Sequence, residues 1–371
     1  KEARKAKAAT TLPAPGFPSI EPLRGFVWKN VEPEKCRPFV GKERFNLTMA
    51  LENLDPSELI KIDKTYKDRL VLRSSLVKSH PDIVIGVLDL SDSNIRAAVE
   101  EYYSFMLGTY LPGRYPELFK LHDAELVEGS KVHMLENRVT DEVWPVNLPK
   151  DTRRGLEILA KLIDEEVLFL LPDTSSASST SSSTEAENEK EKKNEKKEEK
   201  YMLKAYSTCF PSGFNTREKL GLRLANIHTP VPGYSEKLER SMDRFFSKIE
   251  VGKYVKRVNW SVTTQTELFA AFGGIHGDEG EGMKQLTLDE LDLDSTVLRC
   301  ERQTLHRLPK TKALVFAFHT YIYPISEIKE EGLGEELAKA IDGLKEGNVP
   351  QIYAYKRGPA WGEAVKEYLR S

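Results

Sequence analysis

Histidine is the residue type in this chain best suited to acid–base chemistry or metal binding, and one of the seven histidines has an unusual setting. His228 lies within Asn226-Ile-His-Thr-Pro-Val-Pro-Gly233, where two prolines fix the backbone φ angle. A turn this stiff suits an imidazole that must be held in one direction, as a ligand or a catalytic base is. The competing interpretation is a structural histidine bonded to the backbone, which is the commoner occupant of such a turn.

The other histidines carry weaker signals. We expect five of them in surface turns, polar loops or exposed hairpin ends: His80, His122, His133, His276 and His306. His319 differs because it falls within an apolar run, 313–323, that reads as a strand. There it shares one face with residues such as Tyr321.

Two neighbouring predicted strands carry polar residues at alternating positions. Arg257, Asn259 and Ser261 alternate with apolar residues in one run, and Arg299, Glu301 and Gln303 share a face in the next. If the two faces join, one side of a sheet carries a polar cluster beside aromatic residues. Such a face is either solvated and crossed by salt bridges, or the wall of a ligand pocket.

Generic catalytic motifs are missing from the sequence. It contains no Gly-x-Gly-x-x-Gly, no Walker loop, no His-Glu-x-x-His and no Gly-x-Ser-x-Gly. The segment 273–282 is rich in glycine but acidic, which favours a flexible loop over a phosphate cradle. Three widely spaced cysteines fit neither a disulfide framework nor a Cys-x-x-Cys metal site.

Composition narrows the class of protein. In 371 residues, 55 Lys and Arg oppose 58 Asp and Glu, a formal net charge of −3. Dedicated nucleic-acid binders carry a basic excess, so no nucleic-acid partner is expected. No run of 18 apolar residues is present. A small basic cluster at residues 1–7, which begins without methionine, leads us to expect either a membrane anchor upstream of residue 1, with the chain on the cytoplasmic side, or a disordered tail.

The clearest landmark along the chain is the segment 174–200, first rich in Ser and Thr and then almost entirely Glu, Lys and Asn. It has too little apolar surface to offset the entropy of ordering, so we expect a disordered insert. The runs Glu166–Leu171 and Tyr201–Cys209 flank it and read as strands. If they pair, the insert is a long loop within one hairpin.

Periodicity differs on the two sides of this insert. Residues 36–173 read as mainly helical, with helices near 95–106 and 152–163 and a proline-punctuated connection at 110–119. Residues 201–325 read as strands at 254–262, 296–306 and 313–323 with one helix at 235–249. Residues 1–35 form a tail and 326–371 two more helices. The sequence therefore predicts an α+β chain in which 36–173 and 201–325 form one unit.

Three segments of the sequence carry a family resemblance. Residues 210–234, with Ile-His-Thr-Pro-Val-Pro, 257–261, and 298–309, with Glu-Arg-Gln-Thr-Leu-His-Arg-Leu-Pro, resemble the haem-dependent oxidative N-demethylase alpha-subunit family. The resemblance extends more weakly over about 36–325. The serine-rich insert and the single chain suggest a fungal-type member.

This resemblance implies a PAS-like antiparallel sheet with flanking helices around haem b (heme b). The family's characterised enzyme activates O₂ at the haem and removes a methyl group from a small secondary amine as formaldehyde. By resemblance, His228 becomes the axial iron ligand. Arg257, Asn259 and Arg302 become contacts of the haem propionates or the substrate. His319 or Tyr321 becomes a proton donor toward bound oxygen.

Two features depart from the family pattern. Relatives carry Arg before Thr-Tyr where this chain has His319, so a second histidine could compete as ligand. The sequence has no flavin or iron–sulfur motif, so turnover would need a separate electron-donating reductase. Two alternatives stay open: a PAS-like haem sensor or gas-binding protein without turnover, and an interaction module that has lost haem.

Overall fold

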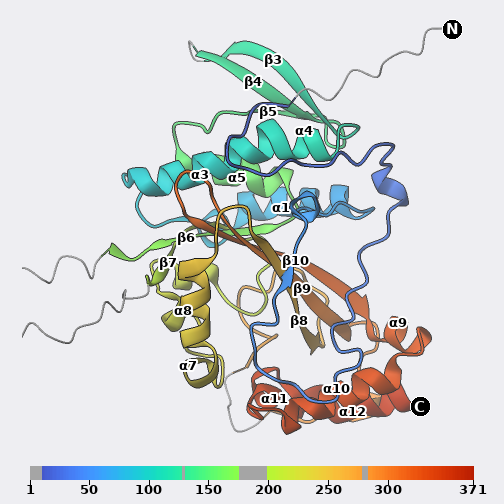
Figure 1. Cartoon of the computed structure of the whole chain (residues 1–371). Helices are drawn as coiled ribbons and strands as arrows, with labels where there is room; N and C mark the ends of the chain where they lie inside the picture. Colours follow the sequence, from blue (N-terminus) through green and yellow to red (C-terminus); the bar gives the residue numbers. More distant parts are fainter. Residues whose placement is uncertain (1–10, 128–129, 175–198, 278–282) are drawn as a thin grey trace, which may run out of the picture.

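A seven-stranded antiparallel sheet forms the centre of the molecule, in the order β1-β8-β9-β10-β6-β7-β2 (Figure 1). The computed structural model describes residues 11–127, 130–174, 199–277 and 283–371. The strands are β1 (Glu52–Asn53), β2 (Ile85–Val87), β6 (Glu166–Pro172), β7 (Tyr201–Ser207), β8 (Tyr254–Thr263), β9 (Val297–Arg307) and β10 (Leu314–Pro324). Together with the surrounding helices, this sheet confirms the predicted α+β class.

The three long strands β8, β9 and β10 form the meander that the alternating apolar pattern predicts. Their residues are buried almost throughout, so both faces of the sheet are covered. The hairpin between β9 and β10 closes through the hydrogen bond from Leu308 N to Ala313 O, at 2.9 Å. Because successive side chains point to opposite faces, the register of this meander decides which residues meet on each side.

The predicted pairing across the insert is present. β6 and β7 are antiparallel neighbours up to the pair Pro172 and Tyr201, and Asp173 N donates to Lys200 O at 2.8 Å. Residues 175–198, most of the predicted insert, lie outside the described residues. The large sheet therefore takes strands from both sides of the insert.

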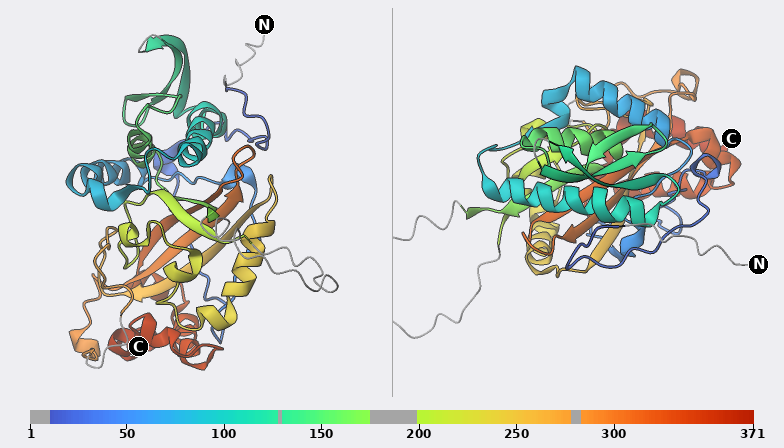
Figure 2. Two further views of the ribbon diagram at one scale, coloured as in Figure 1. Left: turned by 90° about the vertical axis from the view of Figure 1, so that its left-hand side faces the viewer. Right: turned by 90° about the horizontal axis from the view of Figure 1, so that it is seen from above.

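A layer of helices covers one face of the large sheet, and a small sheet lies beyond them (Figures 1 and 2). Asp92 accepts hydrogen bonds from the first turn of α3, and Asp151 from that of α5, so both helices begin where an N-cap residue allows. The elements of this layer are α1 (Tyr66–Ser79), α2 (Pro81–Val84), α3 (Ser93–Phe105), α4 (Leu111–Arg114), α5 (Thr152–Leu162), β3 (Phe119–Val127), β4 (Ser130–Asn137) and β5 (Glu142–Pro145).

Two features of this half differ from the prediction. The segment 119–145 was read as part of a mainly helical half but forms the three-stranded sheet β3-β4-β5. The predicted connection at 110–119 begins as helix, because α3 runs through a π-helical turn, Met106–Tyr110, directly into α4. Pro112 is tolerated because it stands in the first turn of α4.

The remaining helices cover the other face and one end of the large sheet. They are α6 (Leu224–Ile227), α7 (Tyr234–Lys237), α8 (Glu239–Lys248), α9 (Ile325–Glu330), α10 (Gly334–Glu346), α11 (Ile352–Tyr355) and α12 (Gly358–Arg370). The predicted helix at 235–249 is interrupted at Leu238, which ends α7 and precedes α8. Short 3-10 turns occupy Trp28–Asn30, Pro56–Glu58, Thr216–Lys219 and Leu288–Glu290. Among the described residues, every helix is too short or too polar to cross a bilayer.

Residues 38–51, here called the strap, run from the C-terminal helices back to the sheet. Arg37 anchors the start of the strap through Glu327 and Glu331, at 2.9 and 2.8 Å. Farther along, Phe45 N donates to Gly343 O at 3.0 Å, and β1 then joins the sheet beside β8. In Figure 1 the strap is the blue trace that descends to α10 and returns to the sheet as β1.

His306 is buried, contrary to the expectation of an exposed hairpin end. Its side chain is 0 % exposed, its ring stacks on Tyr254 with centroids 4.6 Å apart, and the centroid of the Tyr102 ring is 6.1 Å away. Neither ring nitrogen has a hydrogen-bond partner within the described part of the chain. Burial lowers the pKa of His306 to about 3, so the folded protein keeps this imidazole neutral.

We expect Gly343→Ala to loosen the strap. An added Cβ would lie 2.2 Å from the Glu43 carbonyl oxygen, so either the strap or helix α10 must shift. The clash should lower the free energy of unfolding by about 1–3 kcal/mol, although alanine favours a helix by about 1 kcal/mol. Urea unfolding and tryptic cleavage after Lys42 or Arg44 are the measurements. Gly113→Ala in α4, whose Cβ would meet only Thr11 at 3.4 Å, is the matched control; equal stability of the two variants would contradict the argument.

We expect His306→Phe to flatten the dependence of stability on pH. The folded-state pKa of about 3 lies below the unfolded value, so between about pH 6.5 and 3 only the unfolded chain takes up this proton. Stability therefore falls as the pH falls through that window, and the variant lacks this contribution. Urea unfolding at pH 7 and pH 5 measures the difference, with His122→Phe on β3 as the control replacement. An unchanged pH slope in His306→Phe would contradict the assignment.

Candidate functional site

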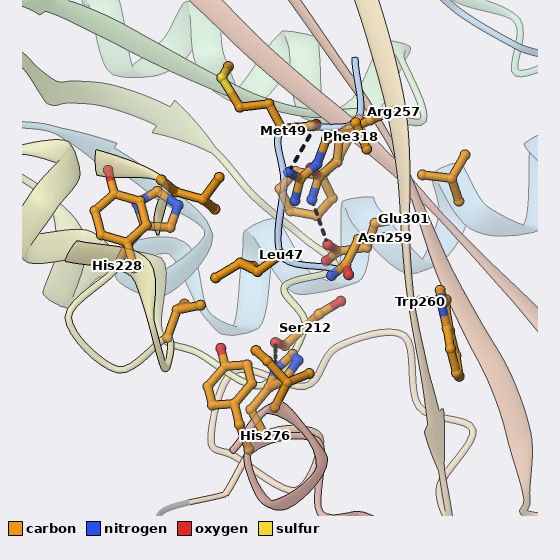
Figure 3. Close-up of a pocket in the computed structure, with 18 of the residues that line it drawn as sticks. Leu47, Met49, Ser212, His228, Arg257, Asn259, Trp260, His276, Glu301 and Phe318 are labelled. Atoms are coloured by element: carbon orange, nitrogen blue, oxygen red, sulfur yellow. Dashed lines mark hydrogen bonds between the residues drawn. The ribbon is translucent and has the colours of Figure 1, made fainter. Parts of the chain in front are cut away.

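A cavity of about 1310 Å³ lies between one face of the large sheet and the strap (Figure 3). It exceeds the roughly 300–1,000 Å³ of ordinary small-molecule pockets. Its remaining walls come from the segment around α6–α8, the loops 212–219 and 271–277, and α11 with Lys356. Most of its lining is apolar, from residues such as Leu168, Leu170 and Phe316.

The floor of the cavity is set by the register of β8, β9 and β10. Arg257 lies opposite Gln303 and Asn259 opposite Glu301, and Phe318 pairs with Gln303 from the other neighbour. All five side chains line the cavity, as Figure 3 shows for those it labels. The predicted joining of the two polar faces is therefore present, and that joint face meets a cavity.

His319, Tyr321 and Arg302 lie on the opposite face of the same sheet. His319 pairs with Arg302 across β9 and β10, is 2 % exposed, and its Nδ1 lies 2.6 Å from Asp164 O. Arg302 donates to the carbonyls of Glu58 and Leu59. Three of the six predicted site residues are thus separated from the cavity by the thickness of the sheet, whereas His228, Arg257 and Asn259 line it.

His228 stands at the end of α6 and lines the cavity. Its Nδ1 donates to Leu224 O at 2.8 Å, and its ring stacks on Tyr234 with centroids 4.6 Å apart and planes 9° apart. Burial lowers the pKa of His228, which keeps the imidazole neutral. Since a carbonyl can pair only with a protonated Nδ1, the lone pair resides on Nε2, which has no partner in the part of the chain the structure describes.

His276 forms a second, similar arrangement that sequence reasoning assigned to a flexible loop. Its Nδ1 donates to Ser212 O at 3.1 Å, and its ring stacks on Tyr355 at 4.7 Å. Burial, with a smaller contribution from the nearby Lys356 ammonium, lowers the pKa of His276 to about 4. The one local signal was the adjacent Ile275, an apolar residue among glycines, which is 1 % exposed here.

Two cationic side chains lie at the cavity wall near a single carboxylate, that of Glu301. Arg257 donates to Gln303 Oε1 at 2.7 Å and to Met49 O at 3.4 Å, and burial lowers its pKa. Lys356 is 3 % exposed and donates to Trp260 O and, at 3.4 Å, to Asn259 Oδ1. Burial lowers the pKa of Lys356 to about 8, more than Glu301 raises it. No sequence pattern singled out Lys356, because only the fold brings α11 to β8.

His228 and His276 are the cavity residues best suited to bind a metal. Across the described ranges, no group of three or more His, Cys, Asp or Glu side chains is arranged to hold a metal ion. His228 and His276 each offer one free imidazole nitrogen. That is the donor set for a metal whose other positions are filled by a macrocycle.

Comparison with protein families gives an independent result. Residues 50–366 match the family described as haem-dependent oxidative N-demethylase, alpha subunit-like. The match spans the sheet, both cavity histidines, Arg257, Glu301 and Lys356, and it confirms the resemblance carried by the sequence segments. The chain belongs to the haem-dependent oxidative N-demethylase, alpha subunit-like family.

Proposed function

We propose that this protein binds haem b in the cavity and uses it, with O₂, to remove a methyl group from a small secondary amine. Membership of the family implies a haem-dependent, N-demethylase-like function. The observation that carries the proposal is the pair of neutral histidines, His228 and His276, on the wall of one large, mostly apolar cavity.

The cavity meets the requirements of a haem. Its volume, about 1310 Å³, leaves room for a substrate beside a macrocycle. Each cavity histidine has its Nδ1 held by a backbone carbonyl, the arrangement that fixes the tautomer and aim of metal-ligating histidines. Arg257 and Lys356 line the cavity and would supply positive charge to the propionates of a bound haem.

We assign His228 as the residue that would hold the haem iron and His276 as a second polar group that would face the substrate. His228 has the shorter Nδ1 hydrogen bond, 2.8 against 3.1 Å, and its turn is stiffened by Pro230 and Pro232. Aim matters most for the group that holds the metal. His276 then holds or delivers a proton at Nε2, the role that resemblance gave to His319 or Tyr321, which the sheet separates from the cavity.

When bound, the haem supplies the redox chemistry: R–NH–CH₃ + O₂ + 2 e⁻ + 2 H⁺ gives R–NH₂ + formaldehyde + H₂O. The two electrons come from a separate reductase. The chain's own residues would surround and orient the ligand. The strap forms the wall opposite the sheet, the ring of Phe318 adds apolar surface to the floor, and Asn259 offers an amide to a polar group of the ligand.

Absorption spectra of the oxidised and dithionite-reduced protein test the ligand. We expect a Soret band that shifts on reduction, and we expect His228→Ala to weaken or move it. His276→Ala should keep the haem but change the spectrum of its O₂ or CO complex. His122→Ala, on β3, is the control. A spectrum unchanged in His228→Ala but lost in His276→Ala would exchange the two roles, and no Soret band in any protein would refute the haem proposal.

Turnover distinguishes an enzyme from a sensor. With a chemical reductant or a surrogate reductase, we expect secondary methylamines such as dimethylamine to yield formaldehyde, one for each methyl group removed. Reversible O₂ or CO binding without formaldehyde across a panel of amines would instead identify a haem sensor or gas-binding protein. The same protein preparation and spectra serve both measurements, so loss of haem cannot be mistaken for loss of turnover.

A further inference from the structure

The cavity wall holds two cations whose donors are incompletely used. Arg257 has five N–H donors, yet it makes only the bond to Gln303 Oε1 and a long one to Met49 O. Lys356 has three donors and uses one fully, toward Trp260 O, and one weakly, toward Asn259 Oδ1. Within the described chain, neither cation forms an ion pair within 4.0 Å.

Two buried arginines outside the cavity, Arg299 and Arg307, use their donors more fully. Arg299 donates to four neutral oxygens, from Ser212, Pro211, Glu267 and Leu268. Arg307 donates to five oxygens, four of them main-chain carbonyls. Neither of these two lines the cavity. Buried donors without a partner also occur away from the cavity, on Arg69, Arg114 and Arg302, but only the spare donors of Arg257 and Lys356 lie where a ligand in this cavity could reach them, among the described residues.

The local compensation available to these cations is small. Among the described residues, Glu301 supplies the one carboxylate on the sheet floor. Its negative charge acts on three cations at once, raising the pKa of Arg257, Arg299 and Lys356 against the effect of burial. The Lys356 ammonium also lies 5.7 Å from the Trp260 ring and 5.9 Å from the Phe45 ring, a weaker stabilisation than a carboxylate gives. A buried cation without an anion is destabilising, so an anionic ligand would stabilise this part of the cavity.

We propose that Lys356, which follows α11, and Arg257 on β8 form a carboxylate-binding subsite of the cavity together with the Asn259 side chain, also on β8. The carboxylate has two possible sources, a haem propionate or an amine substrate that also bears a carboxylate. The proposal deepens the haem function above and rests on it only for the first source. Lys356 is the residue that neither sequence nor resemblance assigned.

Titration of the apo-protein with haem and with haem dimethyl ester, followed at the Soret band, tests the first source. If the propionates occupy the subsite, the ester should bind about 10- to 100-fold more weakly than haem, and Lys356→Met should weaken haem by a similar factor. Glu301→Gln should tighten haem, because it removes a competing carboxylate. Lys42→Met, which removes a cation from the exposed rim of the cavity, should change nothing.

Isothermal calorimetry of the apo-protein with N-methylglycine, and with its neutral amide, tests the second source. Here we expect N-methylglycine to bind better than the amide, and Lys356→Met and Glu301→Gln to shift that preference in opposite directions. This measurement needs no haem, so it separates failure of the haem proposal from failure of the subsite.

The opposite signs expected for Lys356→Met and Glu301→Gln protect the test against a folding defect. A variant that is merely destabilised binds every ligand more weakly, whereas Glu301→Gln is expected to bind haem more tightly. The proposal is overturned if haem and its ester bind equally well, N-methylglycine and its amide bind equally well, and neither substitution changes any of these affinities more than Lys42→Met does.

Discussion

Strand alternation in the β8–β9–β10 meander is the constraint on which the rest of the site depends. Both faces of this sheet are covered, so a shift of register by one residue would exchange the contents of the two faces. The observed register brings Arg257, Asn259 and Glu301 to the cavity and sends His319 and Tyr321 into the opposite core. Which face each of these side chains points to is therefore decided by the strand pairing and not by the surface loops.

The remaining walls complete the cavity by different means. The strap has no helix or strand of its own until β1 and is held by its contacts with the C-terminal helices, including the close approach at Gly343. His228 stands in a turn stiffened by prolines, and His276 in a loop held to Ser212 O. The polar groups therefore come from separated parts of the sequence and meet only because the sheet provides one common floor.

Much of the fold was predictable because its signals are local. The apolar runs at 254–262, 296–306 and 313–323 correctly predicted the meander. The runs that flank the insert correctly predicted the pairing of β6 with β7. The small sheet was missed, since its polar, charged strands lack a clear alternation. His306 was predicted to be exposed and His276 to lie in a flexible loop, because the sequence does not show what packs against a residue, here Tyr254 and Tyr355. Lys356 carried no local signal at all.

Cationic side chains have different partners on the two sides of the sheet. In the helix-covered core, Arg73 pairs with Glu166 and Arg69 with Asp164. On the cavity side, Arg257 and Lys356 keep spare donors beside one shared carboxylate. Arg299 and Arg307, which do not line the cavity, are instead satisfied by several neutral oxygens each. Positive charge without a close anion is unfavourable at the cavity wall, and a ligand carrying negative charge would compensate it.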